Sequence, residues 1–317
     1  MAIQITIIGM DPLGQSMGLA LKESGQPLTI VAHDRTHSNA NQAAAIGAAD
    51  RADWNLLSAI DGADLVIINE PVNQVRETLE LIGPELRADA VITDTSPVKG
   101  VVLRWAEEIL PPTVHFVGGN PLANPATPNK ELFLNQRYAI IPLTSTPEAA
   151  LRLVTNFVTL LGAEPLYIDK DEHDALQTAV MHLPMLLGTA LIQLTTQSGS
   201  WREMASMAST PYAHVTALPS LDPAALAALF RLSRESLRHW LAAYRNELDV
   251  LETLIMEEDT DNALEARLTT LAEARMRWQH NIPNDLQASL YTAAVTEAKE
   301  NNRITRLFSF GRRDRKQ

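Results

Sequence analysis

The chain begins with a strand, a glycine turn and a helix, in an order that few folds use. Residues 3–8 are almost all β-branched, residues 9–14 carry a glycine at each end, and a helical pattern of apolar residues continues to Leu21. This is the first unit of a dinucleotide-binding domain, in which the helix N-terminus presents free N–H groups and a positive dipole end to a pyrophosphate. The sequence therefore predicts Gly9 and Gly14 as cofactor-binding residues.

Asp11 stands where the motif G-x-G-x-x-G places its second glycine. That glycine lets the backbone approach the pyrophosphate, whereas a carboxylate adds bulk and negative charge. Asp11 followed by Pro12 is also a common helix start, in which the aspartate caps the helix and the proline takes its first position. The capping role is compatible with a bound cofactor if the loop moves or the pyrophosphate binds higher. Both interpretations place Asp11 at the predicted cofactor site.

A second strand pattern, residues 28–33, ends at Asp34. An acidic residue about twenty positions after the glycine turn holds the adenosine ribose hydroxyls in dinucleotide-binding domains. Asp34 would repel a 2′-phosphate, so the sequence favours NAD, although Arg35 directly behind it could contact that phosphate. We therefore predict NAD and leave NADP as the alternative.

Strand-like and helical patterns alternate up to about residue 170, and after it only helical patterns follow. The later strand-like runs are residues 65–68, 90–93, 114–117, 138–141 and 165–168. The later helical patterns cover about 171–198, 223–257, 261–280 and 284–300, with the proline-bearing stretch 209–222 expected as a loop. The predicted fold class is α/β: a Rossmann-type, mostly parallel, doubly wound sheet followed by an all-α second domain.

We place the dinucleotide-binding domain at residues 1–169, the helical domain at 170–302 and a basic, disordered tail at 303–317. Apolar residues at three-and-four spacing form a stripe from Phe230 to Ile255. A single helix over the whole pattern 223–257 would run roughly 50 Å, more than one small domain covers easily. The stripe predicts a homodimer joined through the helical domain.

Composition excludes several classes of protein and site. The net charge of −12 argues against nucleic acid as a partner, and the absence of cysteine excludes disulfide and thiolate chemistry. No metal-ligand spacing stands out. The longest apolar run, residues 180–194, falls short of a membrane span and is expected to be a buried helix. The first strand begins at once, which leaves no room for a signal peptide and predicts the cytoplasm.

Several motifs in order resemble the prephenate and arogenate dehydrogenases of tyrosine biosynthesis, over roughly residues 3–255. The matching segments are residues 7–22, 32–35, 63–72 (ending in Pro71-Val72), 93–100, 117–123, 172–174 and 182–184. The resemblance implies a two-domain NAD(P)-dependent oxidoreductase, commonly a homodimer, that oxidatively decarboxylates prephenate or arogenate as its small-molecule substrate. It also implies that Pro71 belongs to the cofactor site and His182 to the cleft between the domains.

The chain departs from the family pattern where the chemistry takes place. Besides Asp11, Pro97 takes the place of the family's serine, and Ser96 provides a hydroxyl one residue earlier. Asn120 stands where the family has a histidine that accepts the hydrogen bond of the substrate hydroxyl. An amide accepts that bond but takes no proton, and losing a general base typically costs about 10²–10⁴ in rate. The predicted catalytic residues are therefore Ser96, Asn120 and His182.

The family's arginine for the substrate carboxylate falls at Ser206. Arg202 is nearby in sequence, but each residue along a helix turns the side chain by about 100°, so it is no automatic substitute. Two further polar residues, His182 and Lys99, keep two interpretations each. His182 contacts substrate or is a satisfied buried histidine, and Lys99 steadies its loop or lies in solvent. His173 is expected to interact with its acidic neighbours, and His115 to be structural.

Two functions remain open from the sequence. The first is a working oxidoreductase of the prephenate or arogenate type. The second is a catalytically degenerate descendant of the family that binds a ligand or regulates without hydride transfer.

Overall fold

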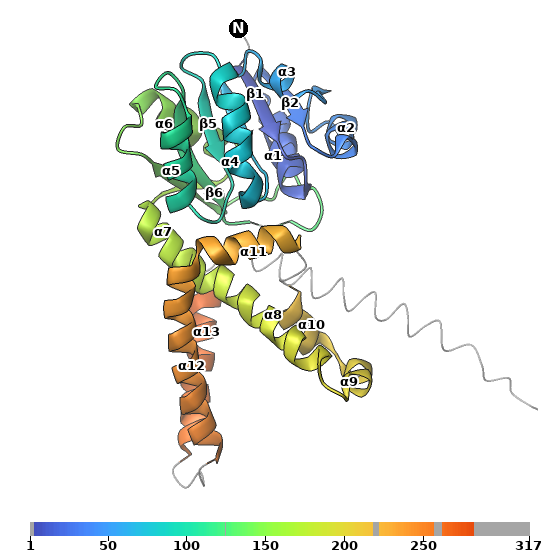
Figure 1. The fold of residues 1–317 in the computed structure, drawn as a ribbon, viewed down its shortest axis with the longest axis vertical. Helices are drawn as coiled ribbons and strands as arrows, with labels where there is room; N and C mark the ends of the chain where they lie inside the picture. The colour runs from blue at the N-terminus through green and yellow to red at the C-terminus, as the bar shows by residue number, and fades with distance from the viewer. Residues whose placement is uncertain (1–2, 124, 218–221, 257–261, 282–317) are drawn as a thin grey trace, which may run out of the picture. The chain divides into compact units, whose positions relative to one another are not determined.

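The computed structural model describes residues 3–123, 125–217, 222–256 and 262–281, and its first part is built on one twisted sheet (Figure 1). The strands are β1 (Ile3–Ile8), β2 (Leu28–His33), β3 (Arg51–Ala52), β4 (Leu65–Ile68), β5 (Val91–Asp94), β6 (His115–Pro121), β7 (Arg137–Pro142) and β8 (Glu164–Tyr167). Within the described chain they form one eight-stranded sheet in the order β3-β2-β1-β4-β5-β6-β7-β8, in which only the β6–β7 pair is antiparallel. This confirms the predicted Rossmann-type sheet.

Helices cover both faces of the sheet because its strands are apolar on both sides. Along β1, Ile7 belongs to one buried cluster and Ile8 to the other, as expected for side chains that alternate across a strand. The helices here are α1 (Pro12–Glu23), α2 (His37–Ala45), α3 (Leu56–Ile60), α4 (Val72–Ile82), α5 (Gly100–Ile109) and α6 (Glu148–Leu160), with a 3₁₀ turn at Gly83–Glu85. Buried residues of α1, α2 and α6 pack with Ile7, and those of α4 and α5 pack with Ile8.

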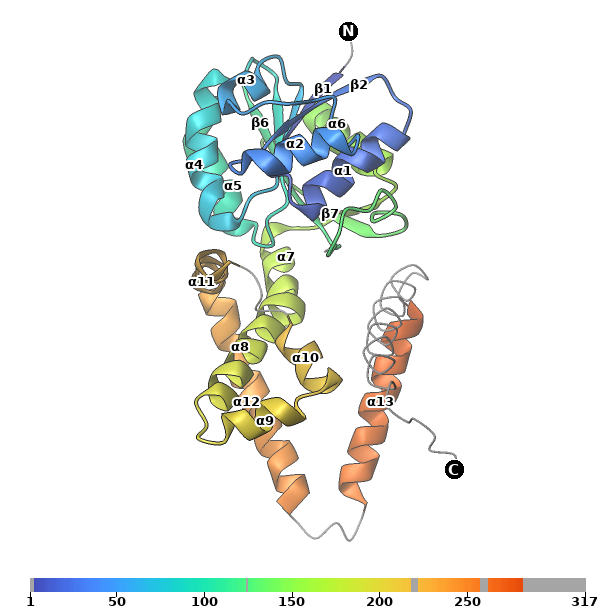
Figure 2. The same ribbon diagram turned by 90° about the vertical axis from the view of Figure 1, so that its right-hand side faces the viewer.

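The part that follows is helical, as predicted (Figure 2). They are α7 (Lys170–Gln177), a π-helix (Thr178–His182), α8 (Leu183–Thr196), α9 (Trp201–Met207), α10 (Thr210–Thr216), α11 (Pro223–Leu232), α12 (Arg234–Met256) and α13 (Ala263–Asn281). The predicted helix at 284–300 and the tail at 303–317 lie outside the described residues.

Two predictions about this part are wrong in detail. Residues 209–222 are not simply a loop, because α10 forms within them with Pro211 in its first turn, where a proline costs no helical hydrogen bond. The single helix predicted at 223–257 is broken at Ser233, which separates α11 from α12. The apolar stripe from Phe230 therefore runs over two helices.

The segment Lys170–Thr196 also differs from expectation. The helix α7, the π-helix and α8 are continuous over 27 residues, and only 28% of its most apolar window is buried. Among the described residues it alone is long and apolar enough, by length and composition, to cross a membrane, which is weak evidence because packed helices pass the same test. The helix predicted at 171–198 is therefore found, but it is only partly buried, whereas the run 180–194 was expected to be a buried helix.

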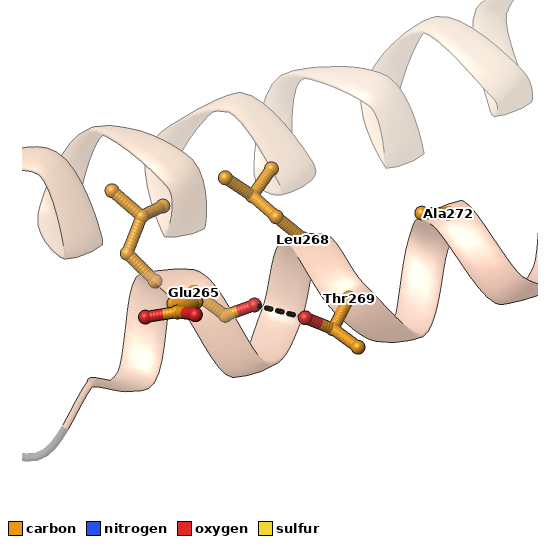
Figure 3. A pocket seen from close by; sticks show the side chains of 5 residues that line it. Glu265, Leu268, Thr269 and Ala272 are labelled. Atoms are coloured by element: carbon orange, nitrogen blue, oxygen red, sulfur yellow. Dashed lines mark hydrogen bonds between the residues drawn. The ribbon is translucent and has the colours of Figure 1, made fainter.

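Contacts within the chain define two compact units, residues 1–250 and 251–317, and the predicted domain boundary at residue 169 stays a prediction. In the second unit, the described part of α13 carries a shallow hollow (Figure 3) lined by Leu264, Glu265, Leu268, Thr269 and Ala272. Its polar hydroxyl, Thr269 Oγ1, donates to the carbonyl oxygen of Glu265 at 2.9 Å. All lining residues come from one helix face, so the hollow has the features of an ordinary helix surface.

Candidate functional site

A pocket of about 220 Å³ lies at the carboxyl edge of the sheet. Its lining residues come from the turns after β1, β4 and β5 and the helix starts that follow β1 and β4, from the π-helix, and from α11 with its capping residue: Asp11, Leu13, Asn69, Glu70, Pro71, Val72, Thr95, Ser96, Pro97, Met181, Asp222, Ala225 and Leu229. Ligands of open α/β sheets bind at this edge, where the loops after the strands meet. The pocket brings together Asp11, Pro71 and Ser96 of the residues that the sequence predicted.

The glycine turn is packed so tightly that side chains are excluded from it. Gly9 has a φ of +96°, and a Cβ there would lie 2.0 Å from the carbonyl oxygen of Asn69. A Cβ on Gly14 would lie 2.1 Å from the carbonyl oxygen of Gly9. Glycine at both positions is thus required by the backbone, and the turn keeps the close approach that a dinucleotide site needs.

Asp11 caps α1 and fills the helix N-terminus with its own carboxylate. Its Oδ1 accepts hydrogen bonds from the backbone N–H of Leu13 at 2.9 Å and of Gly14 at 3.0 Å. The same oxygen accepts a third from Asn69 Nδ2 at 2.7 Å. The capping interpretation is therefore confirmed, and the anion that occupies this end of the helix belongs to the chain itself.

Asn69 links three turns at the sheet edge, a role that the sequence reasoning missed. Its Nδ2 also donates to the carbonyl oxygen of Gly9 at 3.0 Å, and its Oδ1 accepts from Thr95 Oγ1 at 2.9 Å. The position directly after the buried β4 strand was the available signal, because polar side chains there lie among the loops of the site.

The two residues expected at the adenosine end are held by the chain. Asp34 accepts hydrogen bonds from the backbone N–H of Met10 at 2.6 Å and of Thr36 at 2.7 Å, so it lies against the glycine turn. Arg35 pairs with Glu70 at 2.9 Å and with Glu77 at 2.8 Å. The guanidinium is thus directed to acidic groups around α4. Together with the glycine turn, Asp34 fits an NAD-type cofactor.

A buried ion pair supports the neighbouring strand ends. Lys99 Nζ lies 2.6 Å from both carboxylate oxygens of Asp94 and donates to the carbonyl oxygen of Gly119 at 2.5 Å, and both side chains are fully buried. Burial lowers the pKa of Lys99, and the charge of Asp94 opposes that shift. Lys99 therefore steadies the loop before Asn120, and its alternative of lying in solvent is excluded.

Asn120 is buried at the end of β6 and contacts a histidine that we did not assign to the site. Its side-chain nitrogen lies 2.9 Å from His173 Nε2, and His173 Nδ1 lies 2.9 Å from Asp174 Oδ1. Asp174 also accepts hydrogen bonds from the backbone N–H of Lys99 at 2.6 Å and of Gly100 at 2.8 Å. His173 does interact with an acidic neighbour, as expected, but it also connects that carboxylate to Asn120.

Ser96 carries a buried hydroxyl that has no hydrogen-bond partner among the described residues. Its backbone N–H donates to Asp94 Oδ2 at 3.0 Å, and the residue lines the pocket. Thr93 of β5 pairs with Val117 of β6, and the two strands are parallel. Ser96 and Asn120 follow this pair by the same number of residues, so both lie toward the same end of the sheet. An unpartnered buried hydroxyl in a pocket is a ready position for a ligand group.

His182 is fully buried behind the pocket, whose lining includes its neighbour Met181. Its Nδ1 lies 3.0 Å from Ser233 Oγ and 3.3 Å from Thr178 Oγ1, and Nε2 is buried without a partner in the described chain. Burial lowers the pKa of His182 to about 4, so the ring is neutral at pH 7. One nitrogen is satisfied by the fold, and a substrate contact through the other stays a prediction.

The position that the resemblance assigns to binding of the substrate carboxylate, Ser206, is exposed and does not line the pocket. Ser206 and Arg202 lie on the short helix α9, and both are exposed. Ser206 Oγ donates to the carbonyl oxygen of Glu203 at 2.7 Å. Neither residue lines the pocket, and the lining given above contains no lysine or arginine.

Comparisons with known proteins agree with this geometry. Residues 17–167 match the family model of the prephenate dehydrogenase nucleotide-binding domain, and residues 169–269 that of its dimerization domain. A prephenate dehydrogenase of Bacillus subtilis is 26% identical over 265 residues, which cover 81% of this chain and 71% of that protein. A cyclohexadienyl dehydrogenase of Zymomonas mobilis is 24% identical, over 82% of this chain and 91% of that protein.

Among solved structures, a prephenate dehydrogenase from A. aeolicus in complex with hydroxyphenyl propionate and NAD+ has the same fold. Its TM-score is 0.80 at 23% identity, with 87% of this chain and 98% of that chain covered. The Synechocystis arogenate dehydrogenase gives a TM-score of 0.70 at 23% identity, with 87% and 100% covered. With two family models that together span most of its length, the chain belongs to the prephenate dehydrogenase family.

Proposed function

We propose that this chain is an NAD-dependent dehydrogenase of tyrosine biosynthesis that oxidatively decarboxylates prephenate or arogenate. The family membership and the names of the relatives support the reaction class. The observation that carries the proposal is the buried amide of Asn120, held by His173 at the end of β6, on the strand next to the one that leads to the unpartnered hydroxyl of Ser96. We expect the protein to act in the cytoplasm.

The cofactor would be held by the glycine turn, by Asp34 and by Pro71 at the rim of the pocket. Bound there, NAD supplies the acceptor for the hydride that the substrate loses. A 2′-phosphate would meet the carboxylate of Asp34, and Arg35 is already paired with Glu70 and Glu77. These charges favour NAD over NADP.

The reaction itself requires an acceptor at the substrate hydroxyl rather than a base. The ring carbon that bears the hydroxyl gives up a hydride while the bond to the ring carboxylate breaks and leaves its electron pair in the ring. Carbon dioxide departs and the ring becomes aromatic. The hydroxyl hydrogen is retained in the phenol product, so the balanced step involves no net proton loss.

Asn120 suits this requirement because its amide oxygen accepts a hydrogen bond at any pH near neutrality. As the hydride leaves, positive charge develops at the ring carbon and its oxygen, and an acceptor at the hydroxyl stabilises that charge. A histidine would also draw the proton away early, a contribution of about 10²–10⁴ in rate. We therefore propose a working but slower site, in which Ser96 supplies the second polar contact.

Asp11 weakens cofactor binding in this proposal. Its carboxylate takes the N–H groups of α1 that a pyrophosphate would use. Two anions at one helix N-terminus repel each other, so binding requires the Asp11 side chain to turn away from Leu13 and Gly14.

The charges of the pocket predict which substrate binds better. Asp11, Glu70 and Asp222 line it, and the lining includes no cationic side chain. Arogenate carries an ammonium group where prephenate carries a keto group. We therefore propose that arogenate has the lower KM of the two.

The helical domain matches the family's dimerization domain, and we propose a homodimer built on it. Exposed apolar side chains on α12 support this assembly, among them Trp240, Tyr244 and Leu248. Replacing Tyr244 and Leu248 with glutamate should yield monomers in sedimentation velocity, whereas Asn246→Glu on the polar side of α12 should leave dimers. A monomeric wild type at micromolar concentration would refute the dimer.

Turnover tests the proposed reaction directly. NAD reduction at 340 nm should occur with arogenate and prephenate, and Asn120→Ala should lower kcat by at least tenfold. His115→Gln, at the opposite end of β6, is the matched control and should retain full activity. NAD binding by calorimetry without turnover of either substrate would instead favour a ligand-binding descendant of the family.

A further inference from the structure

We propose that His173, held by Asp174, is a positioning residue that fixes the amide of Asn120 with its carbonyl oxygen toward the substrate. This inference rests on the proposed function, because it assigns the acceptor atom of the same site. No sequence pattern indicated this contact, since His173 lies more than fifty residues from Asn120.

The argument begins at Asp174, which is held as a carboxylate. Burial alone would raise its pKa, but hydrogen bonds from His173 and from the backbone N–H groups of Gly100 and Lys99 outweigh burial and hold the pKa below its usual range. Both oxygens are acceptors, with Lys99 N and His173 Nδ1 at one and Gly100 N at the other. A carboxylate acceptor at 2.9 Å requires that His173 Nδ1 carry a proton.

The tautomer of His173 then fixes the amide of Asn120. In this proposal the ring is neutral, and with Nδ1 protonated its Nε2 then has only a lone pair and must accept. The Asn120 atom that lies 2.9 Å from Nε2 is therefore its NH₂ group, since the carbonyl oxygen would place two acceptors in contact. His173 is 2% exposed and Asn120 5%, so little water is available to relieve the opposite arrangement.

The carbonyl oxygen of Asn120 is consequently turned away from His173. It makes no hydrogen bond to any of the residues described by the structure, whereas the NH₂ group has its partner. A substrate hydroxyl donates to this oxygen but would meet a donor if the amide were reversed. His173 and Asp174 thus choose between an acceptor and a donor at the reacting centre without touching the substrate.

The tautomer of His173 can be read without any catalytic assay. Long-range ¹H–¹⁵N correlation spectra of protein labelled with [¹⁵N]histidine, assigned with His173→Gln, should show Nδ1 protonated and Nε2 unprotonated at pH 7.5. The opposite tautomer would overturn the inference even if the enzyme is active. A wild type without turnover would count against the proposed function and leave this spectrum as an independent result.

A double-mutant cycle tests the positioning role in the active protein. His173→Lys keeps a group that pairs with Asp174 but offers only donors to Asn120, and it should lower kcat at least tenfold with a smaller change in KM. In the Asn120→Asp background both carboxylate oxygens are acceptors, so the same His173→Lys change should lower kcat by less than threefold. Equal losses in the two backgrounds, with both proteins folded by circular dichroism, would show that His173 has only a structural role.

Discussion

The cofactor half and the substrate half of this site differ in how their polar groups are partnered. On the cofactor half, Asp11, Asp34 and Arg35 bond to groups of the chain itself. On the substrate half, Ser96 Oγ and His182 Nε2 are buried without a partner among the described residues. Unpartnered buried groups cost free energy, and a fold usually keeps them where a ligand supplies the partner. Gln15 Oε1, beside the glycine turn, is also buried without a partner among the described residues, so the two halves differ mainly at Asp11, whose carboxylate occupies the N-terminus of α1. We therefore expect the cofactor half to rearrange on binding and the substrate half to change less.

The largest expected effect lies under the substrate half, at the ion pair of Lys99 and Asp94. Lys99→Met leaves the Asp94 carboxylate buried and unpaired, which should cost about 3–5 kcal/mol of unfolding free energy. Arg35→Met removes a partly exposed guanidinium, 44% accessible, from the cofactor half and should cost less. Urea denaturation followed by circular dichroism measures both losses. Equal losses of unfolding free energy in the two variants would contradict the expectation that the buried ion pair stabilises the fold more than the partly exposed one.

The next effect is the pH dependence that His182 gives to stability. Its folded pKa of about 4 lies below the ordinary value of 6.5, so between these values the unfolded chain binds a proton that the folded chain does not. The free energy of unfolding should therefore fall by about 3 kcal/mol as the pH decreases from 6.5 to 4. His182→Gln should flatten this slope in denaturation curves, and His115→Gln should not. An unchanged slope in His182→Gln would show that other groups titrate.

On the cofactor half, Asp11 should set both affinity and stability. Asp11→Asn keeps a capping side chain and removes the charge, so NAD should bind at least tenfold more tightly at nearly unchanged stability. Asp11→Gly should also bind more tightly but lose up to about 1 kcal/mol with the cap. Titration calorimetry and thermal unfolding measure the two quantities. Sub-micromolar NAD binding by the wild type, unchanged in both variants, would mean that Asp11 does not compete with the pyrophosphate.

The smallest effect on stability belongs to Ser96. Removing a hydroxyl that has no partner should leave the free energy of unfolding within about 0.5 kcal/mol of the wild type, because no hydrogen bond is lost. The same Ser96→Ala change should raise KM or lower kcat several-fold, since the ligand loses a contact. A clear loss of stability without a kinetic effect would show that Ser96 serves the fold instead.

The sheet and the glycine turn were predictable because local patterns determine them. The residues 3–14 and the spacing to Asp34 carry the strand, the turn and the ribose position in one short stretch. The helical part was harder, because α10 has a proline in its first turn and Ser233, where α11 and α12 separate, contacts the distant His182. Helix ends that depend on tertiary contacts leave little trace in periodicity.

The supporting residues of the site were the least predictable. Asn69, His173 and Asp174 contact partners that are distant in sequence. A single sequence does not indicate which distant residues lie in contact. The predicted Ser96 and Asn120 were found at the sheet edge, whereas Ser206 was not near the pocket. The resemblance predicts which positions correspond to the family's site residues. The contacts that support those positions in this chain can be found only in its structure.

The pH dependence of turnover tests most directly whether Asn120 acts as an acceptor that needs no base. An amide does not titrate, so kcat/KM of the wild type with prephenate should be flat between pH 6 and 9. Asn120→His should be faster and should gain a limb near the ordinary histidine pKa of about 6.5, below which its activity falls. A wild-type profile that already shows such a limb would mean that a titrating base takes the hydroxyl proton, and the account of Asn120 would be wrong.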